Sequence, residues 1–454
     1  MANISEERTP TLKRTLGLSG VVIIGIAWVT PLIVLATIGI IAQLSNGAAP
    51  TAYLITLVAM LFTAYSYGRM ASVHYRTAGS AYTYVGREMG PRLGFLTGWL
   101  ILLDYFFIPL VVWLIGAAYL SAQFPGIPTA VWILAFILIT TALNIIGIRV
   151  TARANYLLVA FQLIALGIFV VLSIGYFVGE DTGASLTSPF VNENLTVSAL
   201  AAGAAVAAYS FIGFDGLTLL TEETHDPRRT IPRAMMIVVL FFGALFVTVS
   251  YFAQLVHPGG AFDDVNSAAL ELAREVGGNL FSSFLLAGLI VGQFASGLAI
   301  QAGAARLLFA MGRDGALPRG LSHVLPRLRT PAVSITLIGI AGLGALFLDV
   351  TTSTSFINFG AFSAFTLVNL SVIAYFFRHR PGRGIGAMLL WVVLPLAGAA
   401  IDLYLLLNLD GTAKLIGLIW LALGVLWLAW LTRGFRQAPP QMSLDDGATA
   451  SEGR

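Results

Sequence analysis

Long apolar runs, each about as long as a bilayer core is thick, recur along this chain. The first starts near Leu18 and reaches about Leu44, too long for a signal-peptide core. A helix needs about 20 mainly apolar residues to cross a membrane. We therefore predict an all-α integral membrane protein with twelve transmembrane helices. After the first run, the others lie at roughly 51–73, 94–122, 128–148, 154–178, 197–221, 232–256, 279–308, 331–349, 355–377, 385–408 and 412–432.

The composition excludes several other classes of protein. Hydrophobic residues make up 57% of the chain and charged residues 10%, whereas soluble domains are about a quarter charged. The chain has no cysteine, which excludes disulfides, thiolate metal sites and thiol nucleophiles. Its five histidines fall in or beside polar connectors, and none pair at metal-ligand spacing. We therefore expect no metal site.

The positions of the basic residues predict the orientation of the chain in the membrane. If twelve spans begin with a cytoplasmic N-terminus, all of the 25 Lys+Arg except Arg274 and Lys414 fall on cytoplasmic ends or connectors. This bias is the usual one for multi-pass proteins of the cell (inner) membrane, and it puts both termini in the cytoplasm. The basic pI of about 9.1 then describes the cytoplasmic face and gives no reason to expect nucleic acid.

The spans divide the chain into four expected parts. Residues 1–17 form a cytoplasmic segment, 18–378 a ten-helix core, and 385–433 the last two helices. Residues 434–454, with Pro439, Pro440 and scattered acids, are expected to be a disordered cytoplasmic tail. Every connector is short, so we expect no soluble domain between the spans.

Familiar catalytic motifs are missing from the sequence. The lysines, Lys13 and Lys414, follow Leu12 and Ala413, so neither belongs to a nucleotide-binding loop. The sequence also has no G-x-S-x-G and no H-E-x-x-H motif. We therefore expect that the chain is not an enzyme. The remaining functional classes are a carrier, a channel and a membrane receptor.

Three acids lie well inside predicted spans. They are Asp104, Asp215 and Asp402, and a charge at that depth costs about 2.5–3.5 kcal/mol on insertion scales. Such acids usually face a cavity or a partner. Asp215 lies between Gly213 and Gly216, which weaken a helix, so we expect a functional role for it. Asp104 suits either a functional or a structural role, and we expect Asp402 to be structural.

The first and sixth spans carry helix-weakening residues at corresponding places. The first span has Gly25 in its middle and Pro31 six residues later, and proline cannot continue a regular helix. Paired interruptions of this kind are the best sequence indication of a transporter's midplane site. We predict that the sixth helix unwinds around Ile212–Gly216.

Three segments resemble a known family. "SFIGFDGLTLLTEETHDPRRTIPRA" is similar to the sixth-span signature of the amino acid–polyamine–organocation transporters, S-F-x-G-F-[DE] followed by E-E…P-x-R-x-I-P-[RK]-A. "YRTAGSAYTYVGREMGPRLGFLTGWLILLDY" resembles the family's loop after span two, and "ASGLAIQAGAARLLFAMGRDGALP" its span eight. The likeness covers roughly residues 12–433. Through "LLDYFFIP" and "INFGAFSAFTLVNLSV" the chain looks most similar to putrescine importers.

The resemblance implies a LeuT-like core of five plus five inverted helices, with two peripheral helices. It implies that substrate binds between the broken first and sixth helices. We add Asp104 and Tyr105 of span three, because acids and aromatic faces suit an ammonium group. The residues implied by the resemblance are Gly25, Ile26, Ala27, Trp28, Tyr209, Phe211, Ile212, Gly213, Phe214 and Asp215.

Departures from the family pattern bear on the substrate. Amino-acid transporters of the family usually carry G-[SA]-G in span one, where this chain has Ile24-Gly25-Ile26, so the cradle for a carboxylate is incomplete. This favours an amine. Ala36 argues in the other direction, because putrescine importers place an aspartate there.

Three residues are candidates for ion coupling. Gln162 stands where some proton-linked relatives have a lysine, Ser296 could bind sodium, and Asp215 could carry a proton. We favour a proton over sodium and expect no cofactor.

The charged connector after span six permits two interpretations. Glu222 and Glu223 lie near Arg228, Arg229 and Arg233, so these side chains could pair as an inner gate. Alternatively they are a solvated connector, where exposed ion pairs contribute only about 0–1 kcal/mol.

The sequence thus predicts a secondary active importer of a small amine such as putrescine, or of an amino acid, working by alternating access. The alternative is a permease or exchanger for zwitterionic amino acids. A channel or a receptor that does not transport is less favoured. The expected partners are the substrate and the lipid bilayer, and the chain is expected to be a monomer or homodimer.

Overall fold

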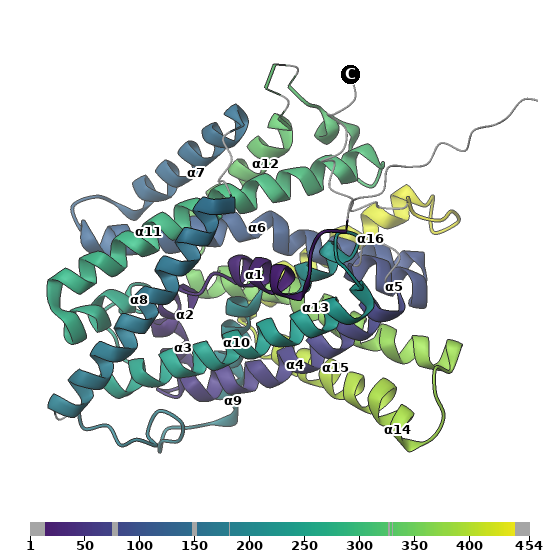
Figure 1. Ribbon diagram of the computed structural model, residues 1–454. Coiled ribbons are helices and arrows are strands. Elements are labelled where there is room, and N and C mark those ends of the chain that lie inside the picture. The colour runs from purple at the N-terminus through teal and green to yellow at the C-terminus, as the bar shows by residue number, and fades with distance from the viewer. Residues whose placement is uncertain are drawn as a thin grey trace, which may run out of the picture.

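The computed structural model describes residues 14–74, 80–147, 152–180, 182–325, 327–328 and 330–440. All of its long elements in these ranges are helices (Figure 1). Several expectations fall partly outside the described residues: the segment 1–17 before residue 14, the tail 434–454 after residue 440, and the start of the loop motif at 75–79.

Eleven helical segments of the described chain are long and apolar enough to cross a membrane. The ninth expected span, 331–349, instead forms a shorter apolar helix, Ala332–Leu346. Eleven of the twelve predicted spans therefore have membrane-crossing length. The long helices are α4 (Ala49–Val73), α6 (Pro91–Gln123), α7 (Thr129–Ile146), α8 (Ala152–Gly179), α10 (Pro227–Val256), α11 (Ala268–Arg313), α13 (Val350–His379) and α16 (Gly411–Leu431).

The remaining elements are shorter, and several of them join into one span. The first span consists of α1, α2 and α3, and the sixth of α9, η1 and η2. The short elements are α1 (Leu18–Val29), α2 (Ile33–Ala36), α3 (Ile38–Leu44), α5 (Ala81–Met89), α9 (Val197–Ala207), η1 (Ala208–Phe211), η2 (Asp215–Thr221), η3 (Arg319–Ser322), α12 (Ala332–Gly342), η4 (Leu343–Leu346), α14 (Ile385–Met388), η5 (Leu389–Val393) and α15 (Leu394–Leu407).

The first span lies near the middle of the bundle, where α1 packs against α8, α10 and η2 (Figure 1). Helices α4 and α10 pack along each other. A Cβ at Gly243 would lie 2.3 Å from Cδ1 of Leu57, so any larger residue would force the Leu57 side chain to move. Small residues at helix contacts are typical of membrane bundles.

Large apolar side chains cover the outside of the bundle. On α8, Leu157 is 72% exposed and Val178 is 80% exposed, and on α16 Leu426 is 66% exposed. In water such a surface would be an interaction site, whereas in a bilayer it is the expected lipid-facing surface.

Asp402 holds three helices together. It is fully buried, and its Oδ2 accepts hydrogen bonds from Thr63 Oγ1 and Asn369 Nδ2, both at 2.9 Å. These residues come from α15, α4 and α13. Buried polar groups are tolerated when they are hydrogen-bonded, so the geometry agrees with the structural role expected for this acid.

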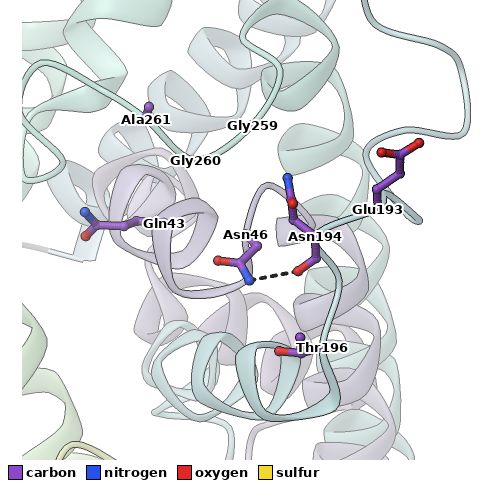
Figure 2. Close-up of a pocket in the computed structure, with 8 residues that line it drawn as sticks. All are labelled: Gln43, Asn46, Glu193, Asn194, Thr196, Gly259, Gly260 and Ala261. Atoms are coloured by element: carbon purple, nitrogen blue, oxygen red, sulfur yellow. Dashed lines mark hydrogen bonds between the residues drawn. The ribbon is translucent and has the colours of Figure 1, made fainter.

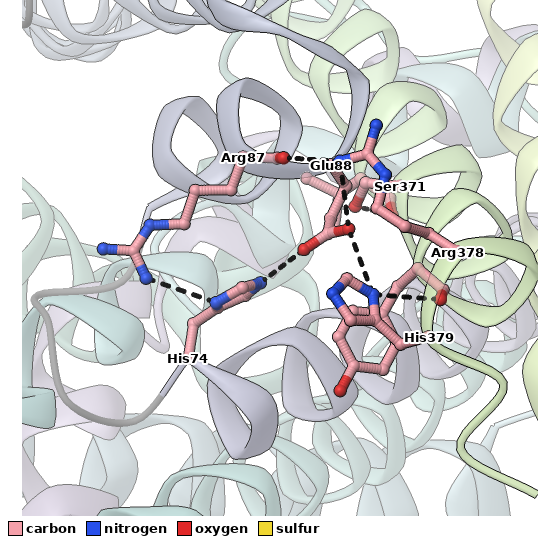
Figure 3. A network of polar contacts seen from close by, with 8 residues as sticks. His74, Arg87, Glu88, Ser371, Arg378 and His379 are labelled. Atoms are coloured by element: carbon pink, nitrogen blue, oxygen red, sulfur yellow. Dashed lines mark hydrogen bonds and ion pairs between the residues drawn. The ribbon is translucent and has the colours of Figure 1, made fainter.

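A second buried acid, Glu88, lies close to several basic side chains at one end of the bundle (Figure 3). Its Oε1 lies 3.0 Å from Nε2 of His74, and its Oε2 lies 3.9 Å from Nη1 of Arg378 and 3.8 Å from Nδ1 of His379. Arg378 also donates to the carbonyl oxygen of Arg87, at 3.0 Å. The network therefore links the ends of α4 and α13 to α5.

The network makes stability depend on pH. Burial lowers the pKa of His74 below its usual 6.5, so folding favours the neutral ring. The stability gained from a neutral His74 is present above about pH 6.5 and is lost as the pH falls below that value. We expect the melting temperature of the wild type to fall more steeply between about pH 7 and pH 5 than that of His74→Gln. Parallel curves for the two proteins would contradict this.

Candidate functional site

The first span breaks after α1. Thr30 has φ 58° and ψ 90°, and Pro31 follows before α2 begins at Ile33. Gly25 does not break the helix: a Cβ there would lie 2.9 Å from Cγ2 of Val238. Gly25 therefore serves close packing against α10, and the break lies beside Pro31, several residues later than Gly25.

The sixth span loses its α-helical form in the middle. Helix α9 ends at Ala207, a 3₁₀ turn follows, and Gly213 has φ 112° before a second 3₁₀ segment begins at Asp215. A Cβ on Gly213 would lie 3.3 Å from the carbonyl oxygen of Trp28. The break predicted around Ile212–Gly216 is thus present, and it lies against the end of α1.

Trp28 joins three spans at this point. Trp28 is 42% exposed although it lies near the end of α1, next to the break. A Cβ on Gly216 would lie 3.1 Å from Cζ3 of Trp28 and 3.9 Å from Oη of Tyr105. The absence of a side chain on Gly216 therefore leaves room for an indole and a phenol from the first and third spans.

The structure brings Asp104 and Asp215 together. Their charges are close enough to interact, and Asp104 also interacts with Tyr209. The backbone N–H groups of Asp215, Gly213 and Gly216 lie close enough to the Asp215 carboxylate to stabilise its negative charge. Oδ1 of Asp104 is buried and has no hydrogen-bond partner among the described residues.

No basic side chain of the described chain forms an ion pair with Asp104 or Asp215. Two neighbouring carboxylates without a counter-charge are chemically suited to binding a cation.

Other expected site residues have different surroundings. The ring of Phe211 lies 5.2 Å from that of Phe246, and the ring of Phe214 lies 5.6 Å from that of Phe365. Both side chains are 1% exposed and belong to the packed core, so we leave them out of the proposed site. The half-buried residues beside the two breaks are Ile26, Ala27 and Ile212.

Gln162 contacts the break in the first span directly. Its Oε1 accepts a hydrogen bond from the backbone N–H of Leu32 at 3.1 Å, in a buried position. A Cβ on Gly292 of α11 would lie 3.7 Å from Gln162 Nε2. Ser296, half-buried, lies one turn after Gly292 on the same helix. The candidate coupling residues therefore come from the helices that flank the break.

We expect Gln162→Leu to destabilise the protein, because it leaves the buried N–H of Leu32 without an acceptor, at a cost of about 1–3 kcal/mol. Gln162→Glu, with its carboxyl group protonated at acidic pH, keeps an acceptor oxygen in place and should destabilise less. Thermal unfolding of the two purified variants measures this difference. Equal melting temperatures for Gln162→Leu and the wild type would show that the hydrogen bond does not support the break.

Comparison with known proteins places this geometry in a family. A model of the amino acid permease family matches residues 20–396. The chain belongs to this family. The low-affinity putrescine importer PlaP of Escherichia coli K12 is 38% identical over 435 residues, 95% of this chain and 96% of that protein. The resemblance expected from the sequence motifs is confirmed.

More distant relatives of this permease carry other names. The methylthioribose transporter of Bacillus subtilis 168 is 26% identical over 93% of this chain and 94% of its own. The branched-chain amino acid permease BcaP of the same strain is 26% identical over 91% of this chain and 92% of its own. The named relatives are transporters, as expected for a chain that is not an enzyme.

Backbone hydrogen bonds connect the first and sixth spans of the permease at the end near Glu88. The N–H groups of Thr15 and Leu16 donate to the carbonyl oxygen of Glu223, both at 2.9 Å, and the N–H of His225 donates to Leu16 at 2.8 Å. Arg229 forms an ion pair at 3.9 Å with Asp226, and both side chains are mainly exposed. Backbone hydrogen bonds therefore join the segment before α1 to the segment after η2.

A polar hollow lies at the opposite end of the bundle, where spans one, six and seven end or begin (Figure 2). Its volume is about 690 Å³, and two of its lining residues are joined by a hydrogen bond, which Asn46 donates to the carbonyl oxygen of Asn194 at 2.9 Å. The sequence does not indicate the hollow because its residues come from separate segments of the chain. Its lining is Gln43, Asn46, Glu193, Asn194, Thr196, Gly259, Gly260 and Ala261.

Proposed function

We propose that this permease is a secondary active importer of a small amine, with putrescine or a close relative of it as substrate. The observation that carries the proposal is the neighbouring pair Asp104 and Asp215, which has no counter-cation in the described chain. A substrate with two ammonium groups supplies one positive charge for each carboxylate.

The surroundings of the pair support an amine. Trp28, Tyr105 and Tyr209 offer aromatic faces, and a cation–π contact adds about 0.5–2 kcal/mol when water is excluded. Ala36, where putrescine importers place an aspartate, is buried in α2. In our proposal Asp104 takes over as the second acceptor, and the 38% identical putrescine importer supports the same substrate class.

An amino acid is the second candidate. The break after Thr30 frees backbone N–H groups that could hold a carboxylate. Gln162 already accepts from one of them, that of Leu32, which leaves fewer donors for a substrate. This is why we rank the amine first.

We propose a LeuT-like core of two inverted five-helix repeats, followed by α15 and α16, with twelve crossings in all. The breaks in spans one and six, at corresponding positions of such repeats, support this architecture. We propose a proton as the coupling ion, carried by Asp215, with Gln162 and Ser296 as supporting residues. A monomer or a homodimer is compatible with this mechanism.

In the proposed orientation the end with Glu88 is cytoplasmic and the hollow faces outward. Many acids of the described chain then lie at the outer end, against only Arg274 and Lys414, and such a face concentrates cationic substrates. These acids are Glu180, Glu193, Asp263, Asp264, Glu271, Glu275, Asp349 and Asp410.

Because the chain has no cysteine, single cysteines report orientation cleanly. We expect an impermeant maleimide to label Glu193→Cys in intact cells, and Ser443→Cys only after the membrane is opened. Labelling of Ser443→Cys from outside would overturn the proposed topology.

Transport itself is tested with purified protein in liposomes that carry an imposed proton gradient. We expect saturable accumulation of labelled putrescine that stops when the gradient is collapsed. Flux that does not saturate would indicate a channel, and putrescine binding without flux would indicate a receptor.

A further inference from the structure

Three ligand-type side chains meet at the outer end of the bundle, away from the proposed substrate site. His257 follows the last residue of α10, and Glu271 and Glu275 lie one turn apart near the start of α11. Nδ1 of His257 lies 3.1 Å from Oε1 of Glu275 and 4.0 Å from Oε1 of Glu271. The three ligand atoms lie within 4.8 Å of one another.

Neighbouring backbone groups orient these side chains. Nε2 of His257 donates to the carbonyl oxygen of Ala261 at 2.6 Å, which turns Nδ1 toward the two carboxylates. The backbone N–H of Asp263 donates to Oε2 of Glu271 at 3.2 Å and leaves its Oε1 facing the ring. Oε2 of Glu275 is buried and has no hydrogen-bond partner in the described chain. Metal-binding histidines typically donate their second ring N–H in this way.

We propose that His257 Nδ1 and the carboxylates of Glu271 and Glu275 form a binding site for a divalent transition-metal ion, zinc in particular. One imidazole and two carboxylates are a common ligand set for zinc, with water at the fourth position. Calcium and magnesium prefer oxygen ligands and more of them. The chain has no cysteine whose thiolate could offer zinc a competing site.

The required adjustment is small. Zinc bonds of about 2.0–2.2 Å place tetrahedral ligands about 3.4 Å apart. Only the Glu271 carboxylate has to approach, and its side chain is 27% exposed, so it has room to rotate. Only the neutral imidazole can bind a metal ion, so an ion displaces any proton on Nδ1 when it binds.

The position of the site gives it a structural consequence. The loop from His257 to Ala261 also borders the polar hollow. A Cβ on Gly260 would lie 2.6 Å from the carbonyl oxygen of Ala42, so the loop packs directly on the end of the first span. A bound ion would fasten this loop to α11, beside the outer ends of spans one and six.

Metal binding is measured on the purified full-length protein without a polyhistidine tag, at about pH 8, where less of the imidazole is protonated. Equilibrium dialysis against zinc should give one high-affinity ion per chain, and cobalt should give a visible absorption band. We expect His257→Asn, Glu271→Gln and Glu275→Gln each to weaken zinc binding at least about tenfold. His323→Asn and Glu193→Gln, which change a distant histidine and a nearby acid, should bind as the wild type does.

Three separate site variants are made so that the test does not depend on the folding of any one of them, and size-exclusion profiles identify the folded ones. Unchanged zinc affinity in the folded site variants would overturn the proposal. So would a wild-type protein that retains no more zinc on dialysis than buffer alone does. Neither result depends on transport, so the substrate proposal stands or falls separately.

Discussion

Asp215→Asn is expected to abolish coupled uptake of the amine while the protein still folds. The substitution keeps the shape of the side chain and its contact with the broken sixth helix but removes the charge. Removing one partner of a buried charge pair costs about 3–5 kcal/mol, so uptake should fall at least about 100-fold. Initial rates of labelled putrescine uptake into proteoliposomes measure the loss.

The matched control for this variant is Asp226→Asn, which neutralises an aspartate whose side chain is 60% exposed. We expect it to transport at nearly the wild-type rate. Both variants should elute as monodisperse protein with melting temperatures near that of the wild type. Wild-type uptake and wild-type proton coupling in Asp215→Asn would mean that this acid is structural.

Asp104→Asn is expected to weaken diamine binding far more than monoamine binding. Its Oδ1 is buried without a partner, and its charge interacts with that of Asp215, so it can accept the second ammonium group. The apparent affinity for putrescine should fall about 100-fold, as for loss of one buried charge contact. n-Butylamine, with one ammonium group, should lose much less.

The ratio of the two affinities is the decisive quantity, since a general loss of folding lowers both together. Competition of each amine against labelled substrate, in wild type and Asp104→Asn, gives this ratio. An equal loss for putrescine and n-butylamine would contradict a role for Asp104 in holding the second ammonium group.

The spans could be predicted from the sequence because a bilayer imposes a length on every apolar run. The ninth is the exception: the sequence predicts 331–349, whereas the helix is Ala332–Leu346, with the 3₁₀ segment η4 as its last turn. Apolar composition does not report this change, since the residues after the turn are apolar too.

The break in the first span shows that a glycine in the sequence does not by itself mark where a helix ends. Gly25 and Pro31 both weaken a helix, but only tertiary packing decides where the helix ends. The side chains of Val238 and Leu217 fill the space beside Gly25, and Gly25 stays helical. Pro31 has no such role, and the chain turns at Thr30, beside it.

The proximity of Asp215, Asp104, Tyr105, Tyr209 and Trp28 could be predicted in part, because buried charges and aromatic residues near a break can be recognised in a sequence. Their role as a substrate site stays a prediction. The directions of Phe211 and Phe214 could not be predicted, because helical periodicity does not apply within an irregular segment.

The cluster of His257, Glu271 and Glu275 could not be predicted from the sequence for a different reason. His257 and Glu275 are 18 residues apart, and a loop brings them together. No fixed spacing could indicate that contact.

The central claim is that the proposed site between the broken helices selects ammonium groups rather than a zwitterion. Competition for binding of labelled putrescine to the purified permease tests it most directly, with unlabelled putrescine, n-butylamine and a series of zwitterionic amino acids as competitors. We predict that putrescine competes best, n-butylamine more weakly, and the amino acids not at all. Displacement by the amino acids alone would contradict the account and show that the broken first helix binds a carboxylate.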